Sequence, residues 1–200
     1  DFSLIMDFQG ASLDTILSTI NADIQLKGKD LNLRGLDIDK FITRFQRSQH
    51  FNLVDLGAVL LAGPVGLAVT KGSDFALVFV HNPDEFSSIT ELISNNSIKD
   101  GQLELSDVAF ATEKNRIAAK GWLNFISDSL DITIGVVNPK GCEILSQQVQ
   151  GTLKEPNLGK VHIIAKLFAP VSNIFKDKYG DDCDSFYTGK LKHPELKEKD

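Results

Sequence analysis

Three kinds of residue in this sequence are able to support chemistry: histidines, neighbouring carboxylates and cysteines. The four histidines are scattered, and none has a second metal ligand at the spacing of a helix turn or a hairpin. Asp37 and Asp39 look like a carboxylate pair, but they stand at the start of a predicted helix, where a carboxylate acts as a cap. The sequence also lacks a Gly-x-Ser-x-Gly elbow and a phosphate-binding loop. We therefore predict no catalytic residue, no metal site and no cofactor, and a protein that is not an enzyme.

The two cysteines, Cys142 and Cys183, both stand in polar, turn-like sequence. Such positions are unusual for a buried free thiol and suit the ends of a disulfide bond. An even count permits a bond without requiring it, so two free thiols are the alternative. The bond would close a loop of about forty residues, worth roughly 4 kcal/mol in the chain-entropy model. We favour the bond, which indicates an oxidising compartment, and expect residues 179–200 to be a polar tail tied back by it.

Composition limits the class of protein and of partner. The chain has 200 residues, of which 42% are hydrophobic, and a formal net charge of −6. These values fit a single domain, residues 1–200, with a hydrophobic core. We predict no nucleic-acid partner, because phosphate binding needs a concentrated basic surface. The longest uncharged run, residues 56–69, is too short for a membrane-spanning helix. The chain begins at Asp1 rather than methionine, and we interpret it as a mature product or an excised fragment.

The strongest structural signal is a run of three predicted strands in residues 102–137. Apolar and polar residues alternate there, and short polar turns at 113–115 and 127–129 separate the strands. A period of two with tight turns is typical of an antiparallel meander with one apolar face. We assign eight residues to this face, as core residues or lipid contacts: Ile117, Ala119, Leu123, Phe125, Leu130, Ile132, Ile134 and Val136.

The remaining segments divide into further strands and helices. Strands are predicted at residues 2–8, 21–34, 75–80 and 144–153, and a break at 27–30 is either a hairpin turn or a bulge. Apolar residues at helical spacing predict helices at 12–20, 36–45, 53–61, 83–93 and 158–175. The predicted fold class is therefore α+β, with a curved, mostly antiparallel sheet and several amphipathic helices covering one face or end.

The predicted helix at residues 53–61 has small apolar residues along its length and is followed by Gly63 and Pro64. Small residues allow a helix to approach a sheet closely, so this segment is either a lid over the apolar face or simply part of the core. The candidate lid residues are Leu56, Val59, Leu60, Val65 and Leu67.

The order of several motifs resembles the C-terminal region of AsmA-family proteins. The strand, the glycine and the Leu-Asp helix start in residues 31–41 resemble that family's pattern, as does the Gly-Thr-Leu motif followed by Pro in 150–159. In one subgroup, the cysteine of the tail pairs with a cysteine in a Pro-Lys-Gly-Cys turn like residues 139–142 here, so the resemblance also implies the disulfide. The segments that carry the resemblance are 31–41, 65–72, 97–110, 116–125, 150–159 and 183–194.

The resemblance implies a Gram-negative envelope protein with its body in the periplasm. The full-length protein would be anchored in the inner membrane by a segment that is absent here. Members of this superfamily are viewed as bridge-like lipid carriers, linked to phospholipid supply and outer-membrane assembly. The expected partners are phospholipid, the remainder of the full-length chain and envelope proteins. The alternative is a structural or protein-interaction domain that docks a partner through a strand edge and binds no lipid.

Overall fold

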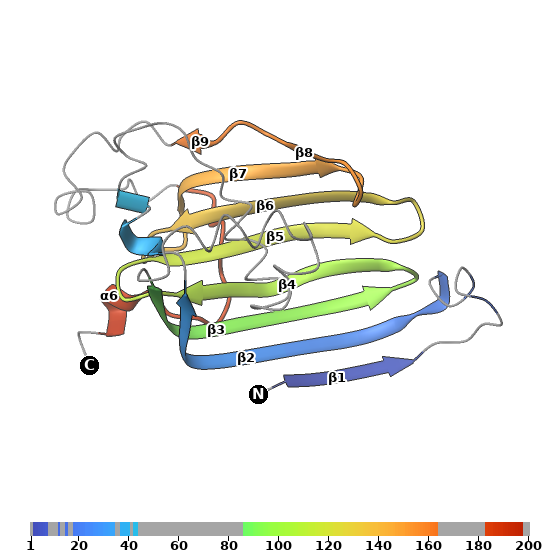
Figure 1. Cartoon of the computed structure of the whole chain (residues 1–200), viewed down its shortest axis with the longest axis horizontal. Helices are drawn as coiled ribbons and strands as arrows, with labels where there is room; N and C mark the ends of the chain where they lie inside the picture. The colour runs from blue at the N-terminus through green and yellow to red at the C-terminus, as the bar shows by residue number, and fades with distance from the viewer. Residues whose placement is uncertain are drawn as a thin grey trace.

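The computed structural model describes residues 2–7, 12, 15, 18–34, 37–40, 42–43, 86–163 and 183–197. Within these residues the chain forms one antiparallel sheet of nine strands (Figure 1). The first eight strands are hydrogen-bonded in chain order. β8 and β9 both pair with β7, β8 at residues 149–151 and β9 at residues 145–146. The strands are β1 (Phe2–Asp7), β2 (Asn21–Arg34), β3 (Phe86–Lys99), β4 (Gln102–Ala111), β5 (Arg116–Asn124), β6 (Ser129–Val137), β7 (Glu143–Gly151), β8 (Pro156–Leu158) and β9 (His162–Ile163).

The predicted α+β class is wrong for the part of the chain that the structure describes. Helix occurs there only as α6 (Pro194–Lys197) and as short stretches near Thr15 and Ile38. The predicted helix at 83–93 lies largely in β3, and β8 and β9 stand where the helix at 158–175 was expected to begin. Strand pairing, and not the packing of amphipathic helices, therefore organises these residues.

An irregularity in the sheet explains why β3 has the sequence pattern of a helix. Ile89 and Leu92 pack in the same core cluster although they are three residues apart, so the side-chain alternation reverses between them. Leu26 and Leu31 on β2 show the same reversal around Asp30, whose φ is 52°. The predicted break in β2 is thus an irregular point in a continuous strand and not a hairpin turn. Apolar residues three apart are the spacing that indicates a helix when only the sequence is read.

Other predictions agree with the structure. The three-strand meander is confirmed as β4, β5 and β6, which are joined by turns at 112–115 and 125–128. The first predicted strand corresponds to β1, and the strand at 144–153 corresponds to β7. The predicted helix at 53–61 and the strand at 75–80 lie outside the described residues.

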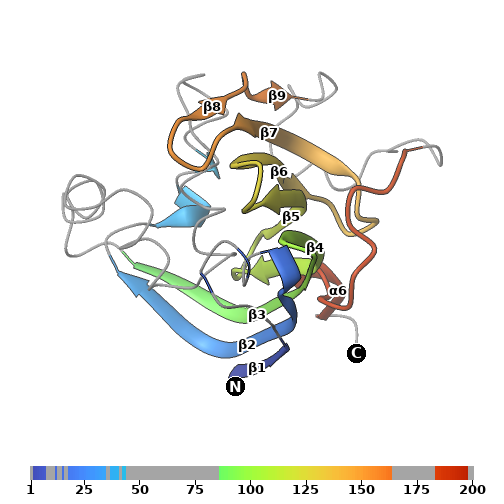
Figure 2. The same cartoon turned by 90° about the vertical axis from the view of Figure 1, so that its right-hand side faces the viewer.

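The sheet curves into an arc when it is viewed along its strands (Figure 2). The short helical stretch that contains residues 37–40 and 42–43, called the 37–43 stretch, lies inside the arc, on what we call the inner face (Figure 2). The C-terminal segment, residues 183–197, lies on the outer face and is called the strap (Figure 2). The inner face holds the larger hydrophobic cluster, which extends from Leu33 on β2 to Val149 on β7. The outer face holds a smaller cluster that includes three strap residues, Phe186, Tyr187 and Leu191.

Candidate functional site

The two carboxylates at the start of the 37–43 stretch have structural partners. The backbone N–H of Lys40 donates to Asp37 Oδ1 at 2.9 Å, so Asp37 caps the helix as predicted. Asp39 Oδ1 accepts hydrogen bonds from Thr112 Oγ1 at 2.5 Å and from Asn115 Nδ2 at 2.6 Å. Asp39 therefore joins this helical stretch to the β4–β5 turn.

The apolar face predicted in residues 102–137 lies on the inner face of the arc. Ile117, Ile132 and Ile134 are 0%, 5% and 2% exposed, respectively. The strand registers place apolar residues directly opposite one another, in rows that run across the sheet. One such row consists of Leu92, Phe110, Ile117, Val136 and Leu145. Directly paired side chains on neighbouring strands contact one another, so the apolar surface is continuous from β3 to β7.

The eight residues assigned to this face differ in depth. Leu123 is only partly buried against the inner cluster. Phe125 lies beyond the end of β5, in the turn, where its N–H donates to the carbonyl of Gly101 at 2.9 Å. Next to it, Ile126 is 57% exposed. The face is therefore deeply buried over most of its extent and only partly buried at Leu123, near the β5–β6 turn. The six buried members are Ile117, Ala119, Leu130, Ile132, Ile134 and Val136.

Part of the cover of the inner face belongs to the described residues. Ile38 and Ile42, from the helical stretch inside the arc, are 0% and 5% exposed and belong to the inner cluster. The N–H of Ile38 donates to Ser87 Oγ at 2.7 Å, which ties the stretch to β3. The candidate lid residues lie outside the described residues: Leu56, Val59, Leu60, Val65 and Leu67.

The strap packs closely on the outer face because the sheet beneath it carries small side chains. Ala109, Ala118 and Gly135 lie on β4, β5 and β6, and both alanines belong to the outer cluster. A Cβ atom added at Gly135 would lie 3.2 Å from the ring of Phe186. Phe186 is 7% exposed, so this part of the strap belongs to the folded core.

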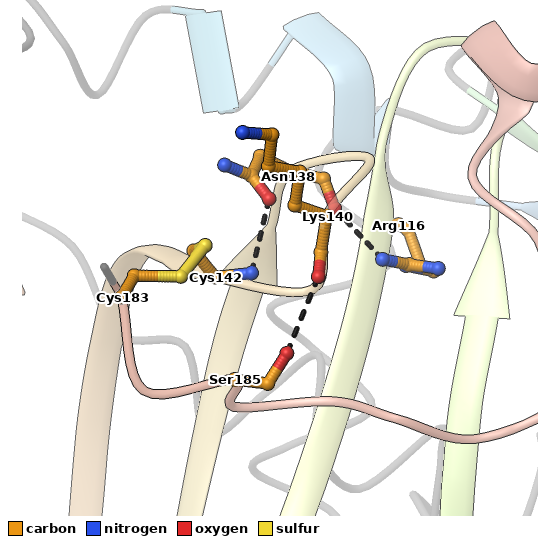
Figure 3. Close-up of a disulfide and its surroundings, with 6 residues drawn as sticks. All are labelled: Arg116, Asn138, Lys140, Cys142, Cys183 and Ser185. Carbon is orange, nitrogen blue, oxygen red and sulfur yellow. Dashed lines mark hydrogen bonds between the residues drawn. A yellow bond between two sulfur atoms is a disulfide. The ribbon is translucent and has the colours of Figure 1, made fainter. Parts of the chain in front are cut away.

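The predicted disulfide is confirmed. The bond between Cys142 and Cys183 fastens the start of the strap to the β6–β7 turn (Figure 3). The carbonyl of Gly141 accepts hydrogen bonds from the N–H groups of Phe186 and Tyr187, at 2.9 and 3.0 Å. Gly141 has a φ of 88°, and a Cβ there would collide with the carbonyl oxygen of Tyr187. A disulfide in this position is consistent with an oxidising compartment.

Arg116 is the centre of a buried polar cluster beneath the strap. Its Nη1 donates to the carbonyl of Leu191 at 2.9 Å, and its Nη2 donates to the carbonyl of Asn138 at 2.7 Å (Figure 3). Its guanidinium also lies over the ring of Tyr187, 5.0 Å from the centroid. Arg116 is 5% exposed, and this burial lowers its pKa. One side chain thus connects β5, the β6–β7 turn and the strap.

Tyr187 and Asp107 form a second connection between the strap and the sheet. Tyr187 Oη donates to Asp107 Oδ1 at 2.6 Å and accepts from the N–H of Leu191 at 3.1 Å. The N–H of Lys190 donates to Asp107 Oδ2 at 3.3 Å. Burial, followed by the hydrogen bond to Asp107, raises the pKa of Tyr187. The tyrosine therefore stays protonated and acts as a hydrogen-bond donor.

The comparisons with known proteins add no relative. No family model, curated protein or solved structure matches this chain. Within the described residues, no helix is long and apolar enough to cross a membrane. Among the same residues, no three His, Cys, Asp or Glu side chains are grouped to hold a metal ion.

Sequence reasoning missed the polar cluster beneath the strap. One signal was present, because the apolar alternation of β4 changes phase between Leu105 and Val108, where the register of its pairing with β5 shifts. That shift marks Asp107 as a residue at an irregular point of the strand. Arg116 carries no such signal, since its partner Leu191 is 75 residues away.

His193 lies at the far end of the strap and caps α6. It is 1% exposed, its Nδ1 accepts from the N–H of Glu195 at 3.3 Å, and its carbonyl accepts from the N–H of Leu196 at 2.9 Å. Burial lowers the pKa of His193 to about 4, and the positive charge of Arg116 acts in the same direction. The folded strap therefore holds a neutral imidazole.

We expect His193 to make the protein less stable as the pH falls. The pKa of His193 is about 4 in the folded state and 6.5 for an unperturbed histidine, so the unfolded state binds the extra proton between these values. The contribution of His193 to the free energy of unfolding is therefore complete above pH 6.5 and decreases as the pH falls toward 4. Between about pH 7.5 and about pH 5 the loss should be about 1–2 kcal/mol. Urea denaturation at both pH values measures it.

The variant His193→Gln should show a smaller loss of stability over this pH range than the wild type. The control is His162→Gln, because His162 is exposed and lies 3.3 Å from Glu143. Equal pH dependence in the wild type and in His193→Gln would contradict the assignment.

Proposed function

We propose that this chain is a non-catalytic region of a periplasmic protein of the AsmA-like superfamily, whose full-length form is anchored in the inner membrane. Its apolar inner face would contribute to phospholipid transport or outer-membrane assembly. The observation that carries this proposal is the continuous apolar surface on the inside of an arc-shaped antiparallel sheet (Figure 2). Acyl chains need a contiguous apolar surface and no reactive group. The disulfide and the order of the sequence motifs support the same assignment.

The gradient of burial along the inner face suggests where an acyl chain would make contact. Phe110 and Ile117, at one end of the sheet, are 0% exposed. At the other end Leu123 is partly buried and Ile126 is 57% exposed. We therefore assign acyl-chain contact to the end of the face near the β5–β6 turn. The deeply buried end serves as the closed core of this segment.

Photo-crosslinking along β5 tests this assignment. A photoreactive amino acid at Leu123 should yield a phospholipid adduct when the chain is produced in the periplasm of a Gram-negative host, irradiated and examined by mass spectrometry. The matched control is the same substitution at Lys120, which is exposed on the outer face of the same strand. The yield at Leu123 should exceed the yield at Lys120 several-fold. Equal yields, or no lipid adduct at Leu123 in a protein that melts like the wild type, would argue against lipid contact.

A second candidate function is protein binding through a sheet edge. β1 is the first strand of the sheet, and Ile5 on it is 65% exposed. An exposed edge strand is able to pair with a strand of another protein. In that case native mass spectrometry should show a lipid-free chain, and a partner that binds the wild type should fail to bind Ile5→Lys. The inner face would then be only the hydrophobic core.

A further inference from the structure

One corner of the sheet carries exposed apolar side chains on its turns. Six large hydrophobic residues are exposed in the described part of the chain, and three of them lie in this corner: Ile126 in the β5–β6 turn, Leu153 in the β7–β8 turn and Leu158 on β8. Ile126 and Leu153 are 57% and 42% exposed. The two turns are neighbours, because the N–H of Leu153 donates to Asp128 Oδ1 at 3.1 Å. A single exposed apolar side chain is ordinary, but two on adjacent turn tips form a surface.

The described elements that cover the sheet are fastened at its other end. Asp39 joins the 37–43 stretch to the β4–β5 turn, and the disulfide joins the strap to the β6–β7 turn. Successive turns of an antiparallel meander lie at opposite ends of the sheet, so the β5–β6 and β7–β8 turns project together from the end away from these attachments (Figure 1). Leu123, the partly buried member of the inner face, lies on β5 three residues before Ile126. The apolar tips therefore continue from the least buried part of the inner face.

The backbone of both tips is suited to an apolar medium. The N–H groups of Ile126 and Ser127 both donate to Asn124 Oδ1 at 2.9 Å. The N–H of Leu153 is likewise satisfied, by Asp128 of the neighbouring turn. A backbone donor that leaves water without an acceptor is costly. Because these donors already have acceptors within the protein, the two tips are able to enter a lipid interface without that cost.

We propose that this corner docks on the surface of a lipid bilayer, with the side chains of Ile126 and Leu153 inserted into its interface. Two projecting turn tips supply far less than the roughly 800 Å² per partner that a stable protein interface buries, whereas projecting apolar side chains suffice to enter a fluid interface. Apolar burial drives this docking, because the exposed charges of these turns and of the β3–β4 turn have both signs: Lys99 and Lys154 are positive, and Asp100 and Glu155 are negative.

The inference rests on the proposed lipid function for its purpose, since a docked corner would place Leu123 next to a source of acyl chains. The docking itself is measured separately. Vesicle binding without a lipid adduct at Leu123 would support the docking and count against the acyl-chain contact. A lipid adduct at Leu123 without vesicle binding would overturn the docking alone.

Flotation of the chain with vesicles of phosphatidylethanolamine and phosphatidylglycerol tests the docking. The wild type should float with the vesicles, and Ile126→Ser/Leu153→Ser should lower the affinity by about tenfold or more, because two aliphatic side chains no longer leave water. The matched control is Phe86→Ser/Leu196→Ser, which removes exposed apolar surface from the start of β3 and from α6. It should change the affinity by less than about twofold.

Two further measurements separate insertion from other kinds of contact. Asn124→Ala keeps every apolar side chain of the tips but leaves the N–H groups of Ile126 and Ser127 without their acceptor, so it should weaken vesicle binding several-fold. Binding of the wild type should persist when the salt concentration is raised, because screening acts on charges and not on apolar burial.

Four results would overturn the proposal. They are a folded wild type that does not float, a control variant that loses as much affinity as the tip variant, unchanged binding by Asn124→Ala, and loss of binding at high salt. Self-association of the wild type that Ile126→Ser/Leu153→Ser abolishes, without any vesicle binding, would instead assign this corner to a second copy of the chain.

Discussion

Replacing Arg116 with methionine is expected to lower the free energy of unfolding by about 2–4 kcal/mol. The change leaves the carbonyl of Leu191 without its donor, and an unsatisfied buried acceptor costs about 1–3 kcal/mol. The carbonyl of Asn138 loses the guanidinium but still accepts from the N–H of Gly141 at 3.0 Å. The change also removes the cation–π contact with Tyr187. Part of this loss is offset, because the variant no longer has to remove a charged guanidinium from water on folding. The lowered pKa of Arg116 reflects this cost of burial. Urea denaturation at neutral pH measures the difference.

Two further variants show whether the geometry of the guanidinium matters. Arg116→Lys keeps the charge, but a single ammonium does not reproduce the planar fork that spans two carbonyls, so most of the loss should remain. Lys114→Met removes a charge from an exposed turn and should change stability by less than about 0.5 kcal/mol. A loss below about 1 kcal/mol for Arg116→Met would show that the strap is held without this residue.

Removing the disulfide is the second large expected effect. The sequence separation of Cys142 and Cys183 is 41 residues, and a loop of this size corresponds to about 4 kcal/mol in the chain-entropy model. The double variant Cys142→Ala/Cys183→Ser should therefore lose roughly 3–4 kcal/mol. The remaining hydrogen bonds of the strap, from Tyr187 to Asp107 and from Arg116 to Leu191, stay available.

Reduction provides an independent check on the disulfide. The mass of the unreduced wild type should not change on alkylation, and a reductant should destabilise the wild type but not the cysteine variant. Combining the cysteine changes with Arg116→Met should cost less than the sum of the two, because both act on the docking of one strap. Strict additivity would mean that the bond and the arginine stabilise separate parts of the fold.

The sequence allowed part of this structure to be predicted. The meander, its apolar face and the cysteine pair followed from strict alternation and from residue type. The assignment failed where the alternation reverses: Ile89 and Leu92 sit on one face of a strand at a spacing of three, which in sequence indicates a helix. The position of the strap could not be predicted from the sequence, because contacts such as that of Tyr187 with Asp107 join residues 80 positions apart and leave no periodic pattern.

The order of the strands has a consequence for how the chain reaches its final form. From β4 to β8, each strand pairs with the strand synthesised just before it, across turns of two to five residues. Such local pairing requires little loop closure and proceeds quickly. A chain that is synthesised from its N-terminus would therefore extend this part of the sheet one hairpin at a time. The strap is different, since Leu191 must return to Arg116, 75 residues back. Cys183 follows all nine described strands in the sequence, so the Cys142–Cys183 bond is able to form only after these strands have been synthesised. The bond would then hold the strap on the completed sheet.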